Sequence, residues 1–174
     1  MIVILRLGHR LPRDERISTH VALAGRAFGA DGIVYSGQHD SGLEKSVSRI
    51  NEQWGGNFWI RYEKKYEEVV NEYKKKGFLI VHLTMYGIQF QNEIDQIKKN
   101  KDILLIVGGQ AVPSEIFELS DFNISVTNQP HSEVSALGVF LYEYFDGKID
   151  KKFENRKIEI NPSKKGKQIV KNKD

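Results

Sequence analysis

The feature that most constrains the fold of this chain is a repeated alternation between short apolar runs and amphipathic helical patterns. Each run rich in β-branched and aromatic residues is followed by a segment whose apolar residues recur about every three to four positions. This order predicts an α/β fold with a mostly parallel sheet and helices on both faces. The expected strands are 1–5, 32–35, 58–62, 78–83, 103–107 and 121–127, and the expected helices are 17–28, 41–54, 63–76, 90–99, 113–119 and 134–145.

The last part of the chain departs from this rhythm. Segments 157–160 and 167–170 alternate in the manner of strands, and turn-forming residues at 161–166 separate them, which predicts a β-hairpin. Residues 148–174 hold ten Lys/Arg and four Asp/Glu, a net charge of +6, whereas residues 1–147 carry a net charge of −3. We therefore expect a body over 1–147 and a basic extension over 148–174. The extension either contacts a polyanion or serves as a solubilising surface.

Composition narrows the class of protein. The 174 residues are 40% apolar and 28% charged, include no cysteine, and offer no apolar run of the ~20 residues that span a membrane. The N-terminal run MIVILRLGHR is charged too early for a signal peptide, so we expect a cytoplasmic protein. There is no G-x-x-x-x-G-K-[ST] loop, no G-x-G-x-x-G after the first strand and no H-E-x-x-H, so we expect neither a standard nucleotide site nor a metal.

Three segments that follow expected strands combine glycine with polar residues: 83–87, 107–113 and 128–133. The carboxyl ends of parallel strands meet at one edge of a sheet, so these segments predict a pocket rich in backbone donors and acceptors, suited to an adenine ring. The alternative is a set of ordinary strand-to-helix turns, with Ser132 as a helix cap. A hydrolase built on Ser132, His131 and Asp121 is a further alternative, although no G-x-S-x-G elbow supports it.

A cluster of arginines follows the first expected strand, in LRLGHRLPRDERISTH at 5–20. Closely spaced guanidinium groups bind phosphates, and crowding by positive charge favours proton loss from a nearby hydroxyl. The alternative is a solvated loop with local Arg–Asp pairs.

These segments resemble a known family. The N-terminal signature lies at 5–10 (LRLGHR), 13–14, 16, 19–21 and 26–30 (RAFGA), and a second signature lies at 128–134 (NQPHSEV). Both are similar to motifs of the archaeal tRNA (cytidine(56)-2′-O)-methyltransferases, members of the SPOUT superfamily. The resemblance implies an α/β fold with a C-terminal trefoil knot, S-adenosylmethionine as cofactor, tRNA as substrate and a homodimer.

The resemblance also implies roles for individual residues. Arg16 is the first choice for the catalytic residue, followed by Arg10 and Arg13. This chain has Gln110 and Ala111 where the family often has an acidic residue and Lys. The cofactor-binding residues that the resemblance implies are Leu83, Gly108, Gly109, Gln110, Ala111, Val112, Val126, Thr127, Asn128, Gln129, Pro130, His131, Ser132 and Glu133.

A function from another class also fits the residues. A non-catalytic RNA- or nucleotide-binding module would share the basic extension and the glycine loops, but it would need no arginine at the pocket. Transfer of a methyl group from S-adenosylmethionine distinguishes the two.

Overall fold

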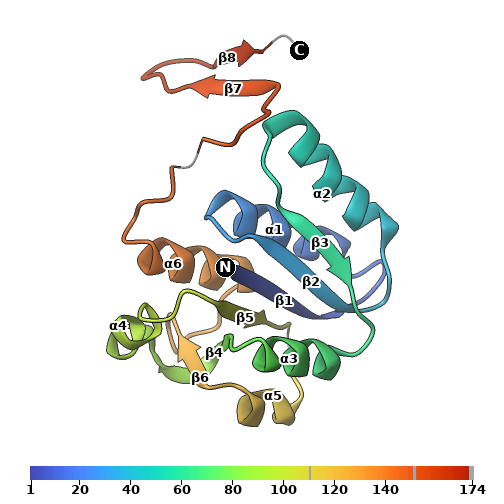
Figure 1. Cartoon of the computed structure of the whole chain (residues 1–174), viewed down its shortest axis with the longest axis vertical. Coiled ribbons are helices and arrows are strands. Elements are labelled where there is room, and N and C mark those ends of the chain that lie inside the picture. Colours follow the sequence, from blue (N-terminus) through green and yellow to red (C-terminus); the bar gives the residue numbers. More distant parts are fainter. Residues whose placement is uncertain (110, 151, 173–174) are drawn as a thin grey trace.

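The computed structural model describes residues 1–109, 111–150 and 152–172. Six strands form one parallel sheet in the order β3-β2-β1-β5-β4-β6 (Figure 1). This confirms the predicted fold class. The strands are β1 (Ile2–His9), β2 (Gly32–Gly37), β3 (Trp59–Tyr62), β4 (Leu79–Gln89), β5 (Ile103–Val107) and β6 (Phe122–Ser125).

Helices cover both faces of the sheet, as predicted. On one face the core includes Val21, Val47, Ile97 and Phe140, which come from α1, α2, α4 and α6. On the other face Val69 of α3 and Ile116 of α5 join the core. The helices are α1 (Glu15–Ala27), α2 (Ser41–Trp54), α3 (Tyr66–Lys75), α4 (Ile94–Ile97), α5 (Ser114–Leu119) and α6 (Glu133–Tyr144), with a 3₁₀ turn η1 (Phe90–Asn92) before α4.

Two strands run further than the sequence predicts. β1 continues past residue 5 to His9, since it pairs with β5 and β2 on its two sides. β4 continues past Leu83 to Gln89, so most of the expected loop at 83–87 belongs to an irregular strand. Its pairing with β6 is interrupted after Leu83 and resumes at Ile88 and Gln89.

The helix expected at 90–99 is wrong in length. The structure has only the turn η1 and a single helical turn, α4, because Glu93 between them leaves the helical conformation with φ −121° and ψ −12°. The helix expected to begin at 63 begins at Tyr66.

The predicted C-terminal hairpin is confirmed. β7 (Ile158–Asn161) and β8 (Gln168–Lys171) form a separate antiparallel pair that projects from the body (Figure 1). The segment leading to it is fastened to the end of α2: the amide of Gly56 donates to the Glu154 carbonyl at 3.1 Å, and that of Lys157 to the Gln53 carbonyl at 3.0 Å. Division of the chain at 147/148 stays a prediction, as does the trefoil knot.

Across residues 1–109, 111–150 and 152–172, none of the helices combines the length and the apolar character that crossing a membrane requires.

Candidate active site

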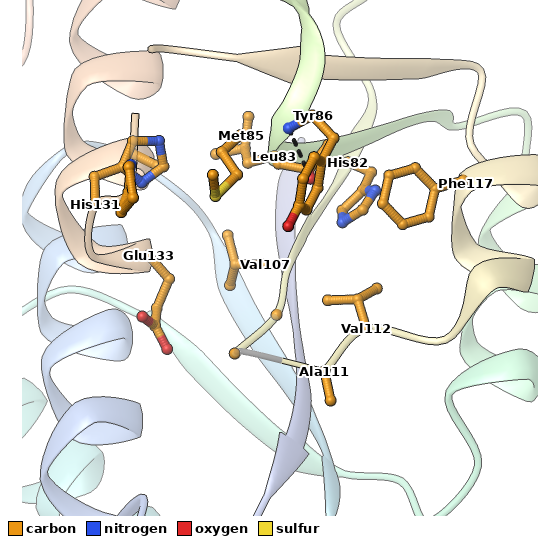
Figure 2. Close-up of a pocket in the computed structure, with 15 residues that line it drawn as sticks. His82, Leu83, Met85, Tyr86, Val107, Ala111, Val112, Phe117, His131 and Glu133 are labelled. Atoms are coloured by element: carbon orange, nitrogen blue, oxygen red, sulfur yellow. Dashed lines mark hydrogen bonds between the residues drawn. The ribbon is translucent and has the colours of Figure 1, made fainter. Parts of the chain in front are cut away.

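A cavity, called the main cavity below, lies at the carboxyl ends of β4 and β5, beside the start of α6 (Figure 2). Its volume is about 470 Å³. Ligands in open α/β sheets bind outside the carboxyl ends of the strands. All three segments singled out in the sequence contribute to this one cavity. It is lined by His82, Leu83, Thr84, Met85, Tyr86, Val107, Gly108, Gly109, Ala111, Val112, Phe117, Pro130, His131, Glu133 and Ala136.

The expected cofactor-binding residues divide into three groups. Those that line the cavity are Leu83, Gly108, Gly109, Ala111, Val112, Pro130, His131 and Glu133. Those that do not line it are Val126, Thr127, Asn128, Gln129 and Ser132. Gln110 lies outside the described residues.

Asn128 holds two of the three segments together without lining the cavity. Its side-chain amide donates to the carbonyls of Met85 at 2.7 Å and Gly87 at 3.1 Å. There is no room for a side chain at Gly87, because a Cβ there would lie 2.5 Å from the carbonyl oxygen of Asn123 in β6. The irregular part of β4 therefore stays in place beside the loop that precedes α6.

The glycine segment after β5 brings the backbone close to its neighbours. A Cβ on Gly108 would lie 2.3 Å from Cγ2 of Val112. A Cβ on Gly109 would lie 3.8 Å from the Arg6 guanidinium. The first glycine leaves room for the Val112 side chain, and the second leaves room beside the Arg6 guanidinium of β1.

The start of α6 forms as the turn alternative predicts, with Ser132 as its cap. The Ser132 hydroxyl accepts a hydrogen bond from the amide of Val134 at 3.2 Å, and Glu133 occupies the first turn. The hydrolase alternative is wrong, since Asp121 lies before β6 and accepts a hydrogen bond from the amide of Ile80 at 2.8 Å. Ser132 follows the opposite end of that strand, so Ser132, His131 and Asp121 do not assemble into a triad.

Arg6 of β1 pairs with Glu133, which lines the cavity, and the sequence patterns gave Arg6 no individual role. Its side chain is 2% exposed; Nη1 donates to the Leu7 carbonyl at 2.6 Å and Nη2 lies 3.2 Å from Oε1 of Glu133. Burial lowers the pKa of Arg6, while the Glu133 carboxylate acts to raise it. The sequence does hold a signal for this ion pair: a charged residue lies within an apolar strand run, and a buried cation needs a partner.

A second, smaller cavity of about 280 Å³ adjoins the first and shares Gly109 and Ala111 with it. Arg6 and Arg10 both line it. Of the three arginines expected to be catalytic, Arg10 lines one of these two cavities and Arg13 and Arg16 line neither. Nε of Arg10 donates to Oδ2 of Asp14 at 3.1 Å.

The other two arginines lie further out. Nε of Arg13 is 3.9 Å from Oδ1 of Asp14, and its side chain is exposed. Arg16 is exposed in the first turn of α1 and lines neither cavity. In the part of the chain that the structure describes, no three His, Cys, Asp or Glu side chains converge as metal ligands.

A family model described as tRNA ribose 2′-O-methyltransferase, aTrm56, matches residues 54–170. The chain belongs to this family. A tRNA (cytidine(56)-2′-O)-methyltransferase of Methanocaldococcus jannaschii is 50% identical over 177 residues, covering 99% of this chain and 98% of that protein. The enzyme of the same name from Methanosphaera stadtmanae is 47% identical over 174 residues and covers 99% of each chain.

Solved structures share the fold of this family member at low sequence identity. The SpoU methyltransferase AviRb from Streptomyces viridochromogenes, in complex with AdoMet, superposes with a TM-score of 0.63 at 16% identity, covering 86% of this chain and 58% of that chain. A TrmH/SpoU tRNA modifying enzyme from A. aeolicus gives 0.63 at 18% identity, covering 84% and 75%.

Proposed function

We propose that this protein transfers the methyl group of S-adenosylmethionine to the ribose 2′-hydroxyl of cytidine 56 in tRNA, in the cytoplasm. Nearly full-length similarity to enzymes of that name carries the proposal. The convergence of three strand-end segments on one cavity supports it, because the reaction requires a closed site for a nucleoside cofactor beside an open approach for RNA.

The main cavity fits the cofactor in size and in the character of its walls. Its apolar side chains, among them Leu83, Val107 and Val112, suit an adenine ring, and Glu133 provides a carboxylate for an ammonium group. When bound, S-adenosylmethionine supplies an electrophilic methyl group on its sulfonium, so the protein's part is mainly alignment of the reacting atoms. Asn128 would hold the surrounding segments rather than touch the cofactor.

The arginine cluster would act on the ribose hydroxyl. A hydroxyl oxygen becomes negative as it loses its proton, and a guanidinium positioned beside it stabilises that charge. Arg10 is favoured within the chain, since it lines the cavity that adjoins the cofactor site and Asp14 fixes its orientation. Arg16, the first choice from the resemblance, would need the substrate or a second copy of the chain to cover its exposed position.

The basic hairpin would contribute to RNA or subunit contacts. Lys164, Lys165 and Lys167 surround its exposed turn, which suits phosphate binding. Changing all three to Ala should weaken tRNA binding and flatten its salt dependence by about one counterion per lost contact, with cofactor affinity unaltered. An unaltered salt slope would exclude phosphate contacts at the hairpin.

A homodimer would cover apolar side chains that the single chain leaves in solvent. Val139 and Tyr142 of α6 are 44% and 48% exposed, and Ile160 and Ile169, paired across the hairpin, are 59% and 56% exposed. Sedimentation equilibrium measures the mass directly, and a monomer at micromolar concentration would argue against a stable dimer.

The function is tested with unmodified tRNA transcripts and methyl-labelled S-adenosylmethionine. Label should enter the wild-type transcript but not a matched transcript carrying 2′-deoxycytidine at position 56, which lacks the hydroxyl. Label in both transcripts would place the reaction on another nucleotide. Cofactor binding without any transfer would favour the non-catalytic binding module.

A further inference from the structure

An unsatisfied nitrogen lies at one end of the main cavity. His82 of β4 is 0% exposed and lines the cavity, with its ring packed edge-on against Phe117 at a centroid distance of 4.8 Å. Nε2 of His82 has no hydrogen-bond partner among the described residues. Buried polar atoms in native proteins nearly always have a partner, so a bound ligand is the natural source of one here.

The neighbouring hydrogen bonds fix what kind of partner Nε2 requires. The side-chain amide nitrogen of Asn123 donates to the Phe117 carbonyl at 2.9 Å. Its amide oxygen therefore faces His82 and accepts a hydrogen from Nδ1, also at 2.9 Å. Burial lowers the pKa of His82, which keeps the ring neutral. With the proton on Nδ1, Nε2 presents a lone pair and can only accept a hydrogen bond.

The choice of ligand donor rests on the proposed function. S-adenosylmethionine offers the exocyclic amine of adenine, two ribose hydroxyls and an ammonium group. Figure 2 shows His82 and Phe117 on one side of the cavity and Glu133 on the other, with Val107 between them. The ammonium suits the carboxylate of Glu133, whereas the aromatic and apolar surroundings of His82 suit a purine.

We propose that Nε2 of His82 accepts a hydrogen bond from the exocyclic amine of adenine and so determines the specificity of the site for adenine. Hypoxanthine carries a carbonyl oxygen at the same position, which would place one acceptor against another. A site built around a buried polar atom rejects a ligand that leaves this atom unpaired. The loss of one such bond corresponds to about a tenfold weaker affinity.

The test compares two ligands on three proteins. Isothermal titration calorimetry gives the affinities of S-adenosylhomocysteine and S-inosylhomocysteine for the wild type, His82→Phe and His39→Phe. The side chain of His39 is exposed and does not line this cavity, so its variant is the matched control. Wild type and His39→Phe should prefer the adenosyl compound by similar ratios, and the ratio should fall about tenfold in His82→Phe. An unaltered ratio in His82→Phe overturns the role of His82.

Failure of the proposed function gives a different result. A wild-type protein that binds neither compound would refute S-adenosylmethionine as the cofactor. Should His82→Phe lose its fold by circular dichroism, NMR of the ¹⁵N-labelled wild type answers the same question. The Nε2 resonance of His82 should shift on addition of S-adenosylhomocysteine and shift less with the inosyl compound. A resonance that does not move, or a proton on Nε2 in the free protein, overturns the proposal.

Discussion

The ion pair between Arg6 and Glu133 gives a quantitative test of how the cavity is held together. Substitution Glu133→Gln keeps the size of the side chain but removes the carboxylate that faces a guanidinium only 2% exposed. Removing one partner of a buried pair costs about 3 to 5 kcal/mol. Glu133 is 20% exposed, and the Gln oxygen still accepts a hydrogen bond, so we expect about 2 to 3 kcal/mol here.

Urea unfolding of the wild type and the variant measures this loss, and calorimetry should show a fall of about 5 to 10 °C in Tm. Glu143→Gln on the same helix is the matched control, since that side chain is exposed and should change stability by less than about 0.5 kcal/mol. The double variant Arg6→Met/Glu133→Gln should be more stable than Glu133→Gln alone, because the uncompensated charge is gone. A Glu133→Gln variant as stable as the control would refute a structural role for the pair.

Three further outcomes are expected at other residues. Gly87→Ala should destabilise the fold by about 1 to 3 kcal/mol in urea unfolding, because its Cβ would collide with the backbone of β6, whereas Gly138→Ala in α6, where a Cβ would lie 3.8 Å from the Phe28 ring, should be nearly neutral. The pKa of His82 is lower in the folded protein than in the unfolded chain, so as the pH drops below about 6.5 the unfolded chain takes up a proton on His82 that the folded protein does not. The free energy of unfolding should therefore fall below that pH, and should fall less in His82→Phe. Arg10→Ala should slow single-turnover methyl transfer about a hundredfold or more while cofactor affinity stays within twofold; a larger loss in Arg16→Ala would return that role to Arg16.

The sequence was sufficient to predict the layered sheet, because the apolar periodicity of each segment reflects which of its faces is buried. It also predicted the convergence of the three segments, which follows from parallel strands ending at one edge. The extension of β4 could not be read locally, since the second stretch of pairing at Ile88 depends on a partner strand that comes much later in the chain. The roles of Arg6 and His82 were missed for the same reason: Glu133 and Asn123, distant in sequence, decide what each side chain does.

The attachment of the hairpin has a consequence for the size of the substrate. The 14 residues of α2 extend about 21 Å from the neighbourhood of the second cavity, where Gln38 precedes the helix, to Gln53, where the C-terminal segment is fastened. Within one chain, therefore, the base of the hairpin and the second cavity lie near opposite ends of one helix. If the hairpin and the arginine cluster both bind RNA, as proposed, that RNA must extend over a comparable length, whereas a short loop fragment would occupy only one surface. Recognition of a whole folded tRNA, rather than of an isolated nucleotide, would then depend on the spacing between two distant surfaces of the protein.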